Sequence, residues 1–237
     1  MATLIQLSKT PKNVTVIEGF PGFGLVGTIT TGFLIDHLNC ELIGKHYFEQ
    51  GPVTLAVHGC RIIDPIGIYY NKKFNILVIH SITPAANLEW KAADLVNDVC
   101  KQCTAKEVIT IEGVGSADIG EEPRAFAYCT NPTTQKQLAK LGYPCLGEGI
   151  IVGVTASLIM RHKLPITSLF AETHSNLPDS KAASKIIEVL DKYLGLNVDA
   201  KPLLKQASEF EHKLKGIMEQ SHKAQELQEK KQLSYVG

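Results

Sequence analysis

The chain has 237 residues, of which 44% are apolar and 20% are charged, and its 24 basic residues balance its 24 acidic residues. This composition is that of a globular protein and excludes a disordered, collagenous or disulfide-stapled chain. Because the net charge is zero, no long-range field attracts nucleic acid or an anionic membrane, so we expect neither as a partner.

The start of the sequence and its cysteines indicate a cytoplasmic protein. Residues 1–10 contain one basic residue and no apolar block of signal-peptide length. The uncharged stretch from Gly19 to Ile35 contains five glycines and is too short for a membrane span. Six cysteines are scattered along the chain, and without a secretion signal we expect them to be reduced thiols.

The hydrophobic pattern predicts an α/β fold, because short β-rich runs alternate with helical stretches. The first unit is a strand at 14–18, a glycine-rich turn and a helix that ends near Asn39. Further strands are expected at 42–48, 53–58, 62–70, 74–79, 107–112, 126–129 and 166–171. A turn at 71–73 indicates that 53–79 forms an antiparallel part of an otherwise parallel sheet.

Helix start and stop signals place four more helices. The first has Asn87 as its N-cap, and the second is capped by Asn131 and ends at Gly142. The third runs from a second glycine-rich stretch at 147–153 to Arg161, and the fourth runs from Pro178 to Gly195.

The composition changes after Val198, so we expect an α/β core domain at 1–198 and a C-terminal helix and tail at 199–237. An apolar stripe at helical spacing marks the start of this helix: Leu203, Ala207, Phe210, Leu214 and Ile217. The rest of the helix carries Glu–Lys pairs four residues apart and reads as solvated. The tail ends in a short apolar tip, which is either a frayed terminus or a segment that binds a partner.

A glycine fingerprint, G-x-G-x-x-G, occupies the first turn. Its glycines are Gly22, Gly24 and Gly27, with Gly19 just before them. After a strand and before a helix, this spacing is typical of dinucleotide binding, where backbone N–H groups hold the phosphates. Pro21 removes one such N–H, and two phenylalanines crowd the turn. The alternative is structural: the glycines let the helix approach the sheet or a neighbouring subunit.

Acidic and histidine side chains recur where the predicted strands end, and they form a candidate ligand site: Glu18, His80, Glu112, Glu172 and His174. In an open α/β sheet this edge is where ligands bind, and carboxylates with a histidine there could perform acid–base chemistry. The alternative is that the carboxylates accept backbone N–H bonds in turns and caps. No nucleophile motif or P-loop is present, so we assign no catalytic residue.

Cys100 and Cys103 form a C-x-x-C pair at the end of a predicted helix. A redox pair favours a helix N-terminus, and a zinc site needs a second pair at matching spacing, which the sequence lacks. We therefore expect two core or surface thiols, and we assign neither a metal site nor a cofactor.

Several motifs together resemble the proteasome assembly chaperone 2 family in its archaeal form. They are the turn at 18–27, Gly147–Gly153, the run Phe-Ala-Glu-Thr-His at 170–174, the run Leu-Pro-Asp-Ser-Lys-Ala-Ala at 177–183, and Leu-Asn-Val-Asp at 196–199. The resemblance implies a three-layer α/β/α sandwich similar to the nucleoside phosphorylase and hydrolase fold, with a mixed, mostly parallel sheet. It also implies a cytoplasmic homo-oligomer that acts as an ATP-independent chaperone.

The same resemblance implies a partner, the α-subunits of the proteasome core particle. Some members bind it through a C-terminal hydrophobic–tyrosine–any tripeptide. Here the tyrosine lies one position earlier, and the expected binding residues are Leu233, Tyr235, Val236 and Gly237. We therefore expect a non-enzymatic adaptor of the proteasome α-ring. The alternative is a nucleoside- or nucleotide-binding enzyme, a hydrolase or a ligase-like protein, that uses the carboxylates at the strand ends.

Overall fold

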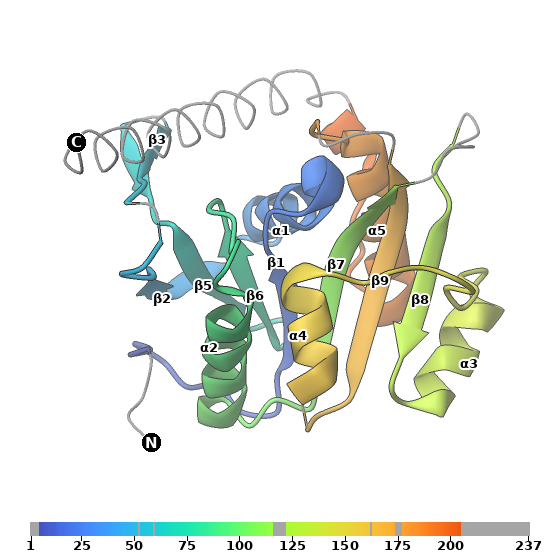
Figure 1. The fold of residues 1–237 in the computed structure, drawn as a ribbon, viewed down its shortest axis with the longest axis horizontal. Coiled ribbons are helices and arrows are strands. Elements are labelled where there is room, and N and C mark those ends of the chain that lie inside the picture. The colour runs from blue at the N-terminus through green and yellow to red at the C-terminus, as the bar shows by residue number, and fades with distance from the viewer. Residues whose placement is uncertain are drawn as a thin grey trace, which may run out of the picture.

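A seven-stranded sheet forms the centre of the computed structural model, which describes residues 5–51, 53–58, 60–115, 122–161, 163–173 and 177–204 (Figure 1). The strand order is β2-β5-β6-β1-β7-β9-β8. The strands are β1 (Thr15–Gly19), β2 (Glu41–His46), β5 (Ile66–Asn71), β6 (Ile76–Ser81), β7 (Glu107–Gly115), β8 (Ala125–Cys129) and β9 (Ile166–Thr173). The four central strands, β6, β1, β7 and β9, are parallel, and β2, β5 and β8 add antiparallel pairs at the two edges.

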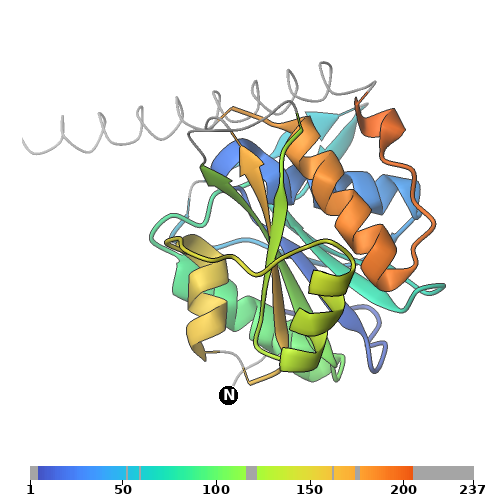
Figure 2. The ribbon, with the colours of Figure 1, turned by 90° about the vertical axis from the view of Figure 1, so that its right-hand side faces the viewer.

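Helices cover both faces of the sheet, which makes the three layers that the family resemblance implies (Figure 2). One face carries α1 (Val26–His37) and α5 (Ser180–Leu194), and the other carries α2 (Glu89–Gln102) and α4 (Gly153–Arg161). A short 3-10 turn, η1 (Phe23–Leu25), precedes α1, and α3 (Pro132–Lys140) packs beside β8. No described helix has the length and apolar character needed to cross a membrane.

Side-chain alternation along the strands divides the interior into two cores. Ile17 of β1 packs with α1 and α5, whereas Val16 and Phe20 pack with α2 and α4. The N-cap of α5 is Asp179, whose side chain accepts an N–H bond from Ala182, as the sequence predicts. These contacts fix the strand ends that carry the candidate site.

Two details differ from the sequence prediction. The expected strand at 62–70 is broken at Pro65, which has no N–H for a sheet ladder, into β4 (Arg61–Ile63) and β5. β4 pairs with β3 (Ala56–His58) in a separate two-stranded hairpin. The second difference is at α2, where Asn87 has a left-handed φ of 63° and Leu88 is the N-cap residue. The predicted tail beyond Leu204 lies outside the described residues.

Candidate functional site

The predicted strand-end residues lie at one edge of the sheet, because β1, β6, β7 and β9 run in the same direction. Gly19 lies opposite His80 in the β1–β6 register, and Val114 lies opposite Glu172 in the β7–β9 register. Glu112 is two residues before Val114. His174 lies outside the described residues. The sheet therefore collects four of the five predicted side chains at its carboxyl edge.

The sheet separates these four residues into two groups. The three glutamates face the α2–α4 side of the sheet. Each lies an even number of residues after a strand residue that packs on that side, and side chains at such spacing share a face: Glu18 after Val16, Glu112 after Val108 and Glu172 after Ile166. His80 instead meets α1, where its Nδ1 lies 2.8 Å from the hydroxyl oxygen of Thr31. Among the described residues, the predicted combination of His80 with the carboxylates is thus not assembled, because His80 is on the other face.

His80 is a structural residue of the α1 layer. Burial lowers the pKa of this imidazole to about 4, so the ring is neutral at neutral pH. The Thr31 hydroxyl beside it is also 2.8 Å from the carbonyl oxygen of Gly27. His80 therefore helps to fix the first turn of α1 against the sheet.

The glycine-rich turn directs its N–H groups at the chain's own carboxylates. The backbone N–H of Phe20 donates to Glu18, and that of Phe23 donates to Glu112. The hydroxyl of Thr155 on α4 adds a 3.3 Å bond to Glu112. A bound phosphate would need such N–H donors to be free. The turn therefore does not fit the nucleotide prediction, and no nucleotide cofactor is assigned.

The glycines of the turn are required by close packing. A Cβ on Gly19 would collide with the carbonyl oxygen of Gly27, and a Cβ on Gly22 would collide with the Glu112 carboxylate. Gly24 has a φ of 65°, and a Cβ there would lie 2.6 Å from the Thr173 hydroxyl. These contacts agree with the structural alternative, in which small residues bring α1 onto the sheet.

Burial shifts the proton affinity of the two inner carboxyl groups. It raises the pKa of Glu112 to about 7. It also raises the pKa of Glu18 well above its usual value, and the neighbouring Glu112 charge raises it further. One carboxyl oxygen of Glu18 has no hydrogen-bond partner. At neutral pH Glu112 is therefore close to its titration midpoint, and the shift of Glu18 in the same direction favours its protonated form.

Glu172 has a different environment, because Arg124 neutralises it. The guanidinium binds both carboxylate oxygens, with Nε 2.9 Å from Oε2 and Nη2 2.5 Å from Oε1. The Arg124 side chain is partly exposed and lies over the ring of Phe126, 5.6 Å from its centroid. Sequence reasoning missed Arg124, because it precedes an antiparallel edge strand and meets Glu172 only through the sheet pairing.

A pocket of about 500 Å³ lies above these groups. Its floor comes from the ends of β7 and β9, its side from the start of β8, and its cover from the loop at 146–152. Figure 1 shows this loop crossing in front of β7 and β9 between α3 and α4. In the sequence, the glycines of this loop indicated the opening of a helix and formed one of the family motifs, and neither interpretation predicted a pocket.

The remaining candidate groups carry no chemistry in the structure. Cys100 and Cys103 are buried free thiols at the end of α2, as predicted. Burial raises the pKa of both thiols, which keeps them protonated and unreactive. Within the described part of the chain, no three His, Cys, Asp or Glu side chains gather as a metal site.

Comparison with known proteins identifies related chains. The profile described as the PAC2 family matches residues 16–218. The uncharacterized protein MJ0106 of Methanocaldococcus jannaschii is 29% identical over 231 residues, which cover 95% of this chain and 94% of that one. PbaA of Pyrococcus furiosus, an archaeal homologue of proteasome-assembly chaperone, is 31% identical with a TM-score of 0.81, and the match covers 93% of this chain and 99% of PbaA.

PbaB of Pyrococcus furiosus, an archaeal proteasome activator, has the same fold. Its TM-score is 0.73 at 22% identity, over 90% of this chain and 98% of PbaB.

Proposed function

Since the chain belongs to the PAC2 family, we propose that it is a proteasome-assembly chaperone homologue that works as a non-enzymatic adaptor of the proteasome core particle. The observation that carries this proposal is the 31% identity to PbaA, an archaeal homologue of proteasome-assembly chaperone, over 93% of this chain.

The chemistry of the strand ends supports an adaptor over an enzyme. The carboxyl groups of Glu18 and Glu112 accept N–H bonds from the glycine-rich turn, and Glu172 is neutralised by Arg124. His80, the candidate acid–base partner that the structure describes, is on the opposite face of the sheet. These groups stabilise the fold, and their arrangement does not favour the nucleotide-handling alternative.

The sequence of the tail supports binding to the α-ring. Tyr235 and Val236 place an aromatic and an aliphatic side chain next to each other, before Gly237, after a polar stretch of the tail. Partners capture such segments by burying their apolar side chains. Burial of one aromatic and one aliphatic side chain contributes at most a few kcal/mol, so one tail binds weakly.

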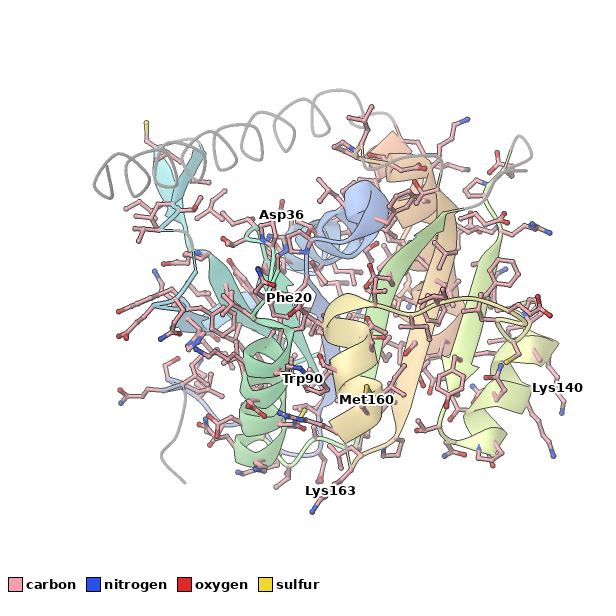
Figure 3. The ribbon with its side chains drawn as sticks, viewed as in Figure 1. Phe20, Asp36, Trp90, Lys140, Met160 and Lys163 are labelled. Atoms are coloured by element: carbon pink, nitrogen blue, oxygen red, sulfur yellow. The ribbon has the colours of Figure 1, made fainter. Side chains whose placement is uncertain are left out.

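Several tails on one oligomer would bind a ring of identical pockets far more tightly, because the later contacts are intramolecular. The α2–α4 face supports self-association, since apolar side chains are uncovered there. Ile150 is 90% exposed, Val152 is 63% exposed and Met160 is 74% exposed. Figure 3 shows Trp90 of α2 and Met160 of α4 on this face. By contrast, α1, the other interface candidate, is covered by the sheet and α5.

Binding of the full chain to purified proteasome core particle tests the proposal. The full chain should bind the α-ring, and deletion of residues 233–237 should abolish binding without changing the Tm or the oligomer mass. A tail-deleted chain that binds as tightly as the full chain would exclude the tail as the anchor. A full chain that does not bind would contradict the adaptor function itself.

A further inference from the structure

The pocket under the loop at 146–152 has a lining that selects a type of ligand. Three carboxyl groups and one guanidinium reach it, from Glu112, Glu148, Glu172 and Arg124. Arg124 and Glu172 neutralise each other, so the charge that remains is negative. An anionic ligand would be repelled, and a cation would be attracted.

Apolar groups make up the rest of the wall. Phe23, Phe126 and Leu146 are among them, and the first two present aromatic rings. The volume of about 500 Å³ lies in the range of small-molecule sites, roughly 300–1,000 Å³. Aromatic faces attract organic cations, whose apolar bodies they also desolvate. The pocket therefore combines a negative end with an apolar body.

A metal ion does not fit this description. Across the residues that the structure describes, no set of three potential ligands converges as a metal site. The carboxyl groups instead lie on different strands, with Glu112 on β7 and Glu172 on β9. The guanidinium of Arg124 binds Glu172 and lies over the ring of Phe126. Arg124 is thus the chain's own example of a nitrogen cation held between a carboxylate and an aromatic ring.

From these contacts we propose that the pocket binds a small organic amine, with its ammonium group on Glu112 and its apolar body against Phe23 and Phe126. Glu112 is the receiving group because Arg124 already occupies Glu172. The site is separate from the tail, so its test does not depend on proteasome binding.

Protonation of Glu112 should control this binding. Its pKa of about 7 means that the ionised fraction rises from about one-tenth at pH 6 to about nine-tenths at pH 8. Among the described residues, the charged or titratable groups around it are Glu18 on β1, Glu172 on β9, Arg124 before β8 and Glu148 in the loop. An amine that stays protonated over this range should bind roughly tenfold more tightly at pH 8.

Calorimetry and amide NMR with phenethylamine test the proposal on the full chain. Phenethylamine should bind at pH 8, roughly tenfold more weakly at pH 6, and it should shift the amide signals of Gly113, Gly115 and Gly147. The neutral analogue 2-phenylethanol and the anionic analogue 3-phenylpropanoate should bind at least tenfold more weakly.

Two variants complete the experiment. Glu112→Gln should weaken amine binding at least tenfold and remove its pH dependence, while a Tm measurement confirms that it folds. Glu49→Gln makes the same chemical change at an exposed position outside the pocket lining and should bind like the unaltered chain. Equal binding of the alcohol, of the carboxylate or by Glu112→Gln would overturn the proposal, as would the absence of amine binding at millimolar concentration.

Discussion

Glu18 and Glu112 lie on adjacent parallel strands and face the same side of the sheet, and each carboxyl group accepts a backbone N–H bond from the turn between β1 and α1. Packing and hydrogen bonds within the chain therefore explain the glycine fingerprint without a bound nucleotide. Small residues bring the turn close to the strands, and the two carboxyl groups accept the N–H bonds of Phe20 and Phe23.

Gly19→Ala should lower the free energy of unfolding by about 1–3 kcal/mol, because its Cβ would collide with the backbone of Gly27 and with the Thr31 side chain. Urea denaturation measures this loss. Gly147→Ala is the matched control, since no heavy atom lies within 4 Å of a Cβ there. Equal stability of the two variants would show that close packing does not explain the glycine at position 19.

Glu112→Gln should become more stable relative to the unaltered chain as the pH rises. The pKa of Glu112 is about 7 in the folded state against 4.5 for an exposed glutamate, so the folded state holds its proton more tightly. This group's contribution to stability is present below pH 4.5 and is lost as the pH rises to 7. The stability difference between variant and unaltered chain should grow by at most about 1.4 kcal/mol per pH unit in that window.

The comparison must be made between variants, because His80 acts in the opposite direction. Its pKa falls from 6.5 to about 4 on folding, so its contribution to stability increases as the pH rises through that range. The pH profile of the unaltered chain therefore mixes both groups. A stability difference between Glu112→Gln and the unaltered chain that does not change with pH would show that Glu112 titrates normally.

Arg124→Ala should destabilise the fold by about 2 kcal/mol, because it removes the guanidinium from a carboxylate that is only 3% exposed. Thermal or urea unfolding of Arg124→Ala, Glu172→Gln and the double variant measures the coupling. In the double variant the buried charge is gone, so most of the loss should be recovered. Additive losses from the two single variants would contradict a direct pair.

Met160→Glu should reduce the mass of the oligomer that we propose, because it places a charge in the exposed apolar face of α4. Light scattering at micromolar concentration gives the mass. Met160→Leu keeps the surface apolar and should leave the mass unchanged. A monomeric unaltered chain would contradict self-association, and an unchanged mass for Met160→Glu would place the interface elsewhere.

Local sequence signals predicted most elements of the fold. The strand, glycine turn and helix at the start are separated by clear turn-forming residues. Asn131, Asp179 and Gly195 mark helix ends where the structure has them. The break between β4 and β5 was missed although Pro65 signals it, because the apolar run around it looked continuous. Asn87 was misplaced as a cap, since its residue type fits a cap but also fits a left-handed turn.

The site was harder to predict, because its contacts depend on pairing between distant segments. The position of residues at strand ends follows from the sequence, but the face each side chain occupies depends on register, which separated His80 from Glu18. The pair of Arg124 and Glu172 joins positions 48 residues apart. No spacing rule along one sequence identifies such a pair.

The hydrogen bonds between the β1–α1 turn and the chain's own carboxyl groups also affect competition with dissolved ligands. A carboxylate fixed within the same chain has a very high effective concentration, so a dissolved phosphate would have to displace it to reach the N–H of Phe23. At the N–H of Phe23, the β1–α1 turn thus already holds a carboxyl group of its own chain. Replacement of Glu112 by a residue without a carboxyl group would free the N–H of Phe23. This glutamate therefore decides whether the turn only supports the fold or can also accept an anion from solution.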